Sequence, residues 1–144
     1  MQPSSHVAHT KRTGLCREVG IARLPFSFWQ QMIKTKSIYD ASHPSDGERI
    51  YIDRLWPEGL STRAAAVERW QQELAPSYEL WRHVYDLEKW EDYRRSYVEE
   101  LKAPDKKRYL DDLRQKAANG VLTLLFGTSD AHRNNAEILK EFLA

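Results

Sequence analysis

The segment Arg49–Gly59, with the sequence RIYIDRLWPEG, decides how the rest of the chain is interpreted. It begins with alternating apolar residues, which favour a strand over 49–55 with alternate side chains on opposite faces. It ends with an acid, a base, an indole, a proline and a glycine crowded together. Pro57 removes a backbone donor and ends strand pairing. A strand that leads into such a polar cluster indicates a functional site at its carboxyl end.

The composition predicts a single domain, because 144 residues with 41% hydrophobic content can enclose one core. The 22 Lys and Arg residues and 21 Asp and Glu residues leave a formal net charge of +1, so we expect no nucleic-acid partner, and any anion site must be local. The single cysteine, Cys16, excludes an intrachain disulfide. Apolar runs are far shorter than the roughly 20 residues that span a bilayer. We therefore expect a cytoplasmic protein with no membrane segment.

The chain divides near residue 32. Residues 1–31 show no sustained helical or strand periodicity, which predicts a loosely ordered N-terminal extension. Within it, Leu24–Trp29 is apolar enough to dock on the rest of the molecule. Residues 32–144 are predicted to form the folded domain.

Three strands are predicted in this domain. A first strand covers 33–39 and is followed by a turn-rich loop over 40–47 that leads into the strand over 49–55. The run Val121–Phe126 is the most apolar in the chain. Because it is continuously apolar and does not alternate, we expect a strand buried on both faces of a parallel sheet.

Four helical regions are predicted from capping residues and apolar stripes with helical spacing. They cover 61–73 (with Val67 and Trp70 on the stripe), 77–102 (with a bend near 85–87), about 105–118, and the C-terminal region after 127–130. The order of strands and helices predicts an α/β fold, a single small domain with a mostly parallel sheet flanked by helices. Ligands of such sheets bind beyond the carboxyl ends of the strands. That rule brings 53–56 and 127–130 together.

Several short motifs of the domain resemble the YeaO-like branch of the bacterial family of domain of unknown function 488. These motifs are Tyr39-Asp40, Ser45-Asp46-Gly47, Asp53-Arg54-Leu55-Trp56-Pro57 with Gly59, Trp70, Pro76-Ser77 with Glu79-Leu80, and Leu122–Phe126. The resemblance extends from Ile33 to the C-terminus. It implies a small cytosolic α/β protein with no established activity.

Two positions depart from the family pattern. Glu58 stands where relatives commonly have a basic residue, and Asn134-Asn135-Ala136 stands where they commonly have Asn-His-Ala. Without that histidine, the chain lacks the general base or metal ligand that the histidine could supply. The loop Phe126–Asp130 also lacks the Cys and His residues seen in the broader family. A thiol or metal mechanism is therefore not expected.

The segment after the second strand supplies the first candidate site residues. The planar fork of Arg54 suits a phosphate or carboxylate, and the alternative is a structural ion pair with Asp53 or Asp130. Asp53 could act as a general base, but orienting Arg54 is the role we favour. Trp56 could stack on a planar ligand, and core packing is the alternative that we favour.

The start of the last helix supplies the other candidates. Thr128, Ser129 and Asp130, with Asn134 and Asn135, lie where free backbone amides and the positive end of the helix dipole favour an anion. Ordinary helix capping is the alternative interpretation.

Two functions remain open. The first is an uncharacterised protein with a small anionic-ligand pocket at the carboxyl ends of the strands. The alternative is a non-catalytic regulatory or protein-interaction module, in which an exposed Trp81 and Trp90 would form a partner surface. We expect neither a metal site nor a cofactor, because the histidines lack metal-ligand spacing apart from His6 and His9. Enzyme status and oligomeric state are left open.

Overall fold

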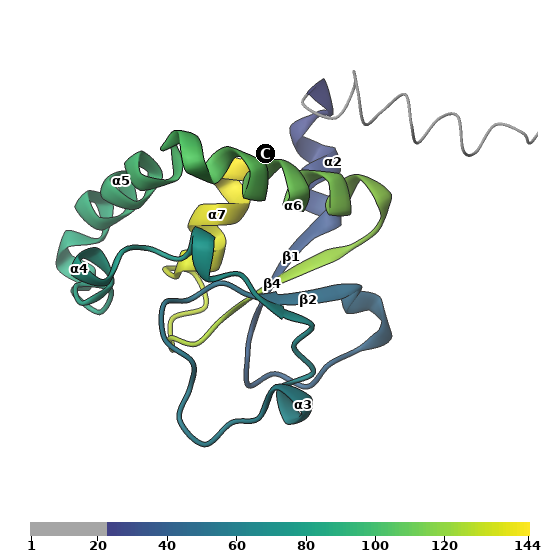
Figure 1. The fold of residues 1–144 in the computed structure, drawn as a ribbon, viewed down its shortest axis with the longest axis horizontal. Helices are drawn as coiled ribbons and strands as arrows, with labels where there is room; N and C mark the ends of the chain where they lie inside the picture. The colour runs from purple at the N-terminus through teal and green to yellow at the C-terminus, as the bar shows by residue number, and fades with distance from the viewer. Residues whose placement is uncertain (1–22) are drawn as a thin grey trace, which may run out of the picture.

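The computed structural model describes residues 23–144, which form a parallel sheet with helices packed on one side (Figure 1). The strands are β1 (Ile33–Ser37), β2 (Glu48–Tyr51), β3 (Arg69–Trp70) and β4 (Leu122–Phe126). The α-helices of this region are α2 (Phe26–Met32), α3 (Thr62–Ala65), α4 (Tyr78–Trp81), α5 (Trp90–Leu101), α6 (Lys107–Asn119) and α7 (Asn135–Leu143). The predicted α/β class and parallel sheet are confirmed. Of the predicted extension, residues 1–22 lie outside the described part of the chain.

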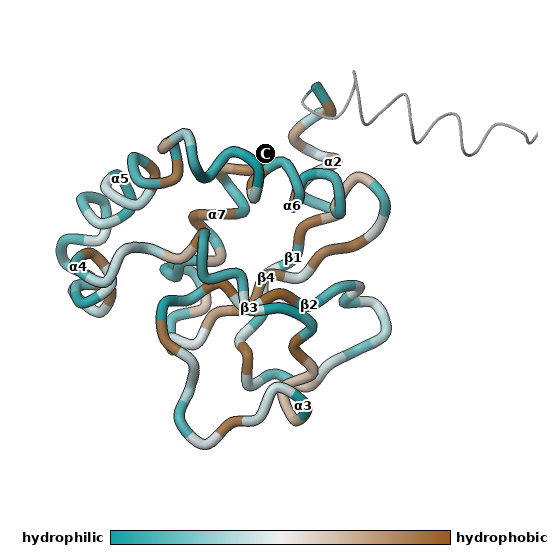
Figure 2. The backbone as a smooth tube through the Cα atoms, viewed as in Figure 1, coloured by the Kyte–Doolittle hydropathy of each residue, from teal (hydrophilic) through white to brown (hydrophobic). Residues whose placement is uncertain are grey.

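The last strand in sequence, β4, lies at the centre of the sheet. The strand order is β1-β4-β2-β3, and every pair is parallel. All five residues of β4 are buried, as its continuous apolar run predicted. Figure 2 shows hydrophobic residues concentrated along the central strands.

The two faces of the sheet are covered differently. One face, which we call the helix face, carries Ile33, Ile50 and Leu124 and packs against α2, α5, α6 and α7. The other, the loop face, carries Tyr51 and is covered by α3 and irregular chain. The expectation of flanking helices therefore holds mainly for one face.

The helix predicted over 61–73 is wrong. Only Thr62–Ala65 is α-helical, and Ala66 ends this helix in the left-handed conformation with φ 53°. A separate 3-10 turn covers Gln72–Leu74. The chain then forms β3, in which Trp70 pairs with Tyr51 of β2. The apolar spacing was correct for burial, but pairing with the open edge of β2 outweighed the local helical preference.

The other helical regions are close to their predicted positions. The region 77–102 divides into α4, a 3-10 turn at Leu87–Lys89 and α5, so the bend near 85–87 is confirmed. The helix predicted at about 105–118 is the 3-10 turn Pro104–Lys106 followed by α6. Upstream of the sheet, α2 packs its buried Trp29 into the core on the helix face.

Candidate functional site

The carboxyl ends of β2 and β4 meet at a buried carboxylate. Asp53, which follows β2, is 3% exposed. Its Oδ2 accepts a hydrogen bond of 2.7 Å from the backbone amide of Gly127, which follows β4. Its Oδ1 accepts one of 2.9 Å from Nδ2 of Asn135, the first residue of α7. The predicted meeting of the two strand ends is therefore observed, with Asp53 as the link.

The network continues onto α5. The hydroxyl of Tyr93 donates to Oδ1 of Asn135 at 2.7 Å, so Tyr93, Asn135 and Asp53 form one buried chain. Burial raises the pKa of Asp53, and the hydrogen bonds from Gly127 and Asn135 offset this only in part. Burial also raises the pKa of Tyr93. We call this buried, closed chain the strand-end network. Tyr93 was not among the site residues predicted from the sequence.

Arg54 points away from the strand-end network. Its guanidinium donates to three backbone carbonyls, those of Pro76 at 2.9 Å, Gln72 at 3.2 Å and Ala75 at 3.3 Å. Within residues 23–144 it makes no ion pair with Asp53 or Asp130. Arg54 thus has a role that neither interpretation of the sequence anticipated: it fixes the chain between β3 and α4.

Trp56 packs in the hydrophobic cluster of the loop face. Its ring contacts Tyr51 edge-on, with centroids 5.1 Å apart, and Trp70 at 5.6 Å. Its indole nitrogen donates to the carbonyl of Leu60. The packing role is therefore what the structure shows for this half-buried side chain.

The last helix begins later than the sequence suggested. It starts at Asn135, so Thr128 and Ser129 do not open it. Asn134 caps it by accepting from the amide of Glu137, as the capping interpretation predicted. The amides of His132 and Arg133 donate to Asp130, and these bonds lower the pKa of its carboxyl. The backbone amides that were expected to attract an anion are thus partly occupied by the carboxylate of Asp130.

Two residues of this loop differ in environment. Ser129 is exposed, whereas Thr128 is 9% exposed. The Thr128 hydroxyl is the one buried side-chain polar atom of residues 23–144 that has no hydrogen-bond partner. A buried hydroxyl without a partner is energetically costly.

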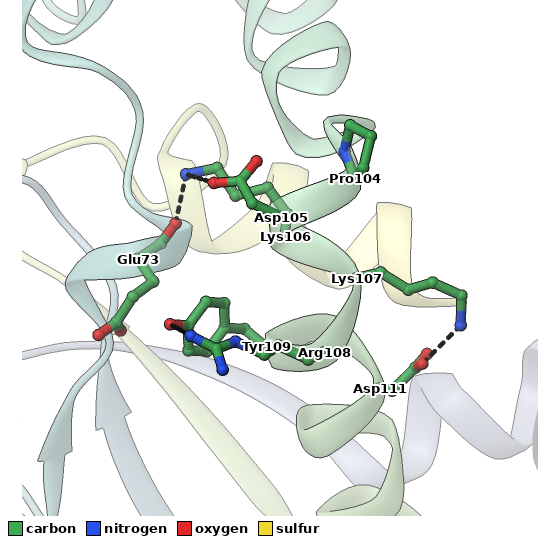
Figure 3. A pocket seen from close by; sticks show the side chains of 8 residues that line it. All are labelled: Glu73, Pro104, Asp105, Lys106, Lys107, Arg108, Tyr109 and Asp111. Atoms are coloured by element: carbon green, nitrogen blue, oxygen red, sulfur yellow. Dashed lines mark hydrogen bonds and ion pairs between the residues drawn. The ribbon is translucent and has the colours of Figure 1, made fainter.

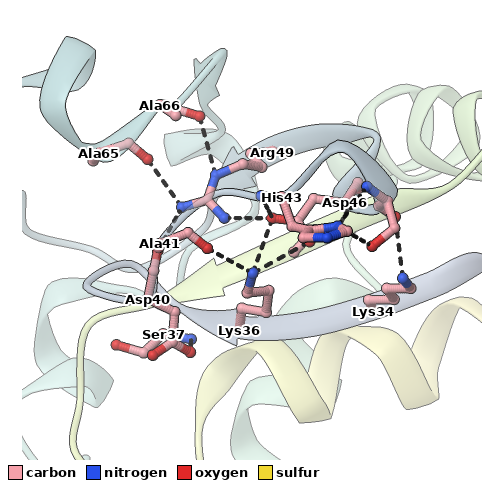
Figure 4. Close-up of polar contacts among 12 residues, drawn as sticks. Lys34, Lys36, Ser37, Asp40, Ala41, His43, Asp46, Arg49, Ala65 and Ala66 are labelled. Atoms are coloured by element: carbon pink, nitrogen blue, oxygen red, sulfur yellow. Dashed lines mark hydrogen bonds and ion pairs between the residues drawn. The ribbon is translucent and has the colours of Figure 1, made fainter.

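A second buried polar cluster, which we did not predict from the sequence, lies on the loop face (Figure 4). Asp46 is 3% exposed and forms ion pairs with Arg49 at 2.7 Å and Lys36 at 3.0 Å. Burial alone would raise the pKa of Asp46, but hydrogen bonds from Lys36, Arg49 and the His43 backbone outweigh it and lower the pKa. We call Asp46, Arg49 and Lys36 the charged cluster.

A signal for the charged cluster was present in the sequence. Lys36 lies two positions after Lys34 in the first strand, and Arg49 lies two positions before Tyr51 in the second. Alternate residues of a strand share one face. The turn Ser45-Asp46-Gly47 lies between the two strands and carries the acid that joins these two cations.

The cavity drawn in Figure 3 shares no residue with the strand-end network or with the charged cluster. It measures about 600 Å³ and is bounded by Glu73 and the start of α6. Lys106 donates to the Glu73 carbonyl at 2.8 Å. The charges that line the cavity cancel, because it has three basic residues and three acids. They are Lys106, Lys107, Arg108, Glu73, Asp105 and Asp111. This cavity contains none of the site residues predicted from the sequence.

The fold and the strand-end network define a small parallel α/β protein in which two of the predicted site residues, Asp53 and Asn135, are bonded to each other. Comparison with known proteins places it further. Residues 32–144 match the family described as "Inactive DUF488-N3 subclade", and the chain belongs to this family. The resemblance to the YeaO-like branch of the family is confirmed.

The relatives that match most of the chain are described as uncharacterised proteins. The chain is 33% identical to the uncharacterized protein YeaO of Escherichia coli (strain K12) over 113 residues, covering 77% of this chain and 96% of that protein. It is 30% identical to the uncharacterized protein Rv3073c of Mycobacterium tuberculosis over 113 residues, covering 77% of this chain and 92% of that protein. No solved structure matches the chain. Within residues 23–144, none of the helices has both the length and the apolar character needed to cross a membrane.

Proposed function

We propose that this protein is a non-catalytic regulatory module that binds a small molecule. One observation carries the proposal: at the strand ends, Asp53 and Asn135 are bonded to each other, and Asn135 also to Tyr93. Both oxygens of Asp53 accept protein donors, and Asn135 is held between Asp53 and Tyr93. A general base needs a lone pair directed at a substrate proton. Asp53 keeps lone pairs that accept no bond, but with 3% of its surface exposed none of them is open to a substrate, and the description of the matched family as inactive supports the same conclusion.

A regulatory module that binds a small molecule is better supported than a partner surface formed by Trp81 and Trp90. Trp90 is 8% exposed and stacks on Tyr93, and Trp81 is partly buried. The two rings do not form the exposed pair that a partner surface would require.

A mixture of nucleotides, sugar phosphates and small carboxylates tests the proposal. Ligand-observed NMR reports which compounds bind, and mass spectrometry of the same samples reports whether any is converted. We expect bound compounds to be recovered chemically unchanged. A product that accumulates over many turnovers with the parent protein, and disappears in a folded Asp53→Asn variant, contradicts the proposal. Binding of nothing in the mixture contradicts its small-molecule part.

The second candidate is the small anionic-ligand pocket predicted at the carboxyl ends of the strands. It is favoured by one observation, the buried Thr128 hydroxyl without a partner. Thr128→Val removes this hydroxyl and should leave the free protein equally or more stable. A ligand at 100 times its dissociation constant stabilises a protein by about 2.7 kcal/mol. If the pocket exists, thermal stabilisation by an anionic ligand is lost in Thr128→Val and retained in an exposed-site control, Ser129→Ala.

A further inference from the structure

A second cavity opens on the loop face. It measures about 510 Å³ and lies between the loop that precedes β2 and the segment that joins α3 to β3. The side chains that matter for its chemistry are those of Ser42, His43, Arg49, Thr62, Arg63 and Glu68. We call it the loop-face cavity. It lies beside the charged cluster and shares Arg49 with it.

The part of the cavity wall formed by Arg49 is rigid. This arginine is 3% exposed, and its guanidinium donates to Asp46 and to the carbonyls of Asp40, Ala65 and Ala66. Figure 4 shows these contacts around Arg49, with Lys36 approaching Asp46. Because two cations share one carboxylate, the charged cluster has a positive charge in excess. An excess charge beside a low-dielectric wall attracts an anion.

The exposed part of the cavity presents hydrogen-bond donors that the protein does not use. Arg63 is exposed and has no hydrogen-bond or ion-pair partner among residues 23–144. The hydroxyls of Ser42 and Thr62 are likewise without a partner in the described part of the chain. His43 accepts from the Ser45 amide through Nδ1, which fixes its ring and leaves Nε2 open.

One acid lines the same cavity. Glu68 is exposed, and its carboxylate accepts from the backbone amide of Arg49 at 2.9 Å. It offsets the charge of Arg63 but not the excess charge of the charged cluster. With His43 neutral, the cavity and the cluster together keep one positive charge in excess.

The backbone beside Arg49 is strained. Ala66 has φ 53°, the one positive φ of a non-glycine residue in the described region. Its carbonyl accepts from Nε of Arg49 at 3.2 Å. Strained residues that persist in a fold are concentrated at binding sites, where the strain holds a required geometry. Here the carbonyl of Ala66 holds the Arg49 guanidinium at the cavity wall.

We propose that the loop-face cavity binds the oxyanion of a small molecule, a carboxylate or a phosphate, with Arg63 as its charged donor. Ser42, Thr62 and His43 supply further hydrogen bonds, and Pro44 and Val67 offer apolar contact to the rest of the ligand. A guanidinium fork matches the geometry of both oxyanions. The inference rests on the proposed binding function and names the class of its ligand and its place.

Backbone amide NMR with two probes tests this inference. The protein is titrated separately with inorganic phosphate and with acetate, against sodium chloride at the same ionic strength. We expect saturable shifts of the amides of Ser42, His43 and Arg63 with at least one oxyanion and not with chloride. The comparison of the two titrations identifies which oxyanion the cavity prefers.

Two variants make the test specific. Arg63→Gln should weaken the binding by about tenfold or more, because it removes a charge-assisted hydrogen bond. Arg95→Gln removes the same charge from the exposed surface of α5 and should leave the binding unchanged. Absence of saturable shifts, equal shifts with chloride, or equal affinity in Arg63→Gln would overturn the inference. These outcomes leave the non-catalytic proposal intact, whereas product formation in the metabolite mixture overturns that proposal and leaves these shifts unaffected.

Discussion

Two aspartates lie seven positions apart in sequence and expose equally little surface, yet the protein treats them in opposite ways. Asp46 and Asp53 are each 3% exposed. Asp46 is paired with Arg49 and Lys36, and its pKa is lowered. Asp53 is paired with an amide and a carboxamide, and its pKa is raised. Low exposure alone therefore does not decide the direction of a carboxyl pKa shift; the depth of the group and the charge of its partners do.

The difference separates a region with buried ion pairs from a region held together by hydrogen bonds without ion pairs. The charged cluster adjoins an open cavity on the loop face, whereas the strand-end network is closed and lies where parallel sheets usually bind ligands. In this protein, Asp53 and Asn135 at the usual location are occupied by internal hydrogen bonds. The loop-face cavity offers more donors that are not used within the described part of the chain.

Breaking the charged cluster should have the largest effect. Asp46→Asn leaves the buried Arg49 guanidinium without its carboxylate, and removing one partner of a buried ion pair costs about 3–5 kcal/mol. Urea denaturation of the variant measures this loss of unfolding free energy. Glu99→Gln is the control, since its pair with Lys102 is exposed and contributes about 1 kcal/mol or less. Equal losses in both variants would mean that burial does not strengthen the Asp46 pair.

A side chain added at Gly47, the residue after Asp46, should have the next largest effect. Gly47 has φ 64°, and an added Cβ would lie 1.9 Å from the carbonyl oxygen of Val121. Gly47→Ala therefore combines a left-handed conformation, about 1–2 kcal/mol, with overpacking, about 1–3 kcal/mol. Gly59→Ala, with φ 79° and no atom within 4 Å, carries only the first cost. Thermal unfolding of the two variants side by side should show the larger loss for Gly47→Ala; equal losses would contradict the steric explanation.

The opposite pKa shifts predict opposite pH dependences. The folded-state pKa of Asp53 is raised above its ordinary value of 3.8, so its contribution to stability is present below 3.8 and is lost as pH rises through the folded-state pKa. Asp46, with a lowered pKa, contributes above 3.8 and loses that contribution as pH falls through its folded-state pKa. Relative to Asp53→Asn, the parent protein should lose stability as pH rises, by at most about 1.4 kcal/mol per pH unit. Denaturation of both proteins between about pH 4 and 8 measures the difference. A difference that does not change with pH would mean that Asp53 is ionised in the folded protein.

Removing the Tyr93 hydroxyl from the strand-end network should have the smallest effect. Tyr93→Phe removes the hydroxyl that donates to Asn135, at a cost of about 0.5–1.5 kcal/mol. Tyr85→Phe, at a side chain that is 67% exposed, should leave the unfolding free energy unchanged. Chemical denaturation distinguishes the two. A neutral outcome for Tyr93→Phe would show that the hydroxyl adds nothing to the strand-end network.

The sequence was most informative where one local pattern had one structural outcome. The continuous apolar run of β4 required burial on both faces, and the polar end of the Arg49–Gly59 segment correctly indicated a meeting point at the strand ends. The helix over 61–73 failed because β3 forms only when the edge of β2 is present. Such pairing is a property of the assembled sheet and leaves no local periodicity.

The site was less predictable than the fold for a related reason. Asp53 and Asn135 were both identified as candidates, but their direct bond joins residues 82 positions apart. Arg54 was expected to face an anion and instead binds three carbonyls of the chain that follows β3. The residue types were informative about polarity, whereas the partner of each side chain depended on loops whose paths a single sequence does not fix.

The central position of β4 has a consequence for biosynthesis. β1 pairs only with β4, and β2 depends on β4 for one of its two edges. While the ribosome is still translating the segment before Leu122, β1 has emerged without its pairing partner. Unpaired strands with apolar faces invite association with other chains. The pairing of β1 therefore waits until β4 leaves the exit tunnel, whereas β2 and β3 can pair before that point.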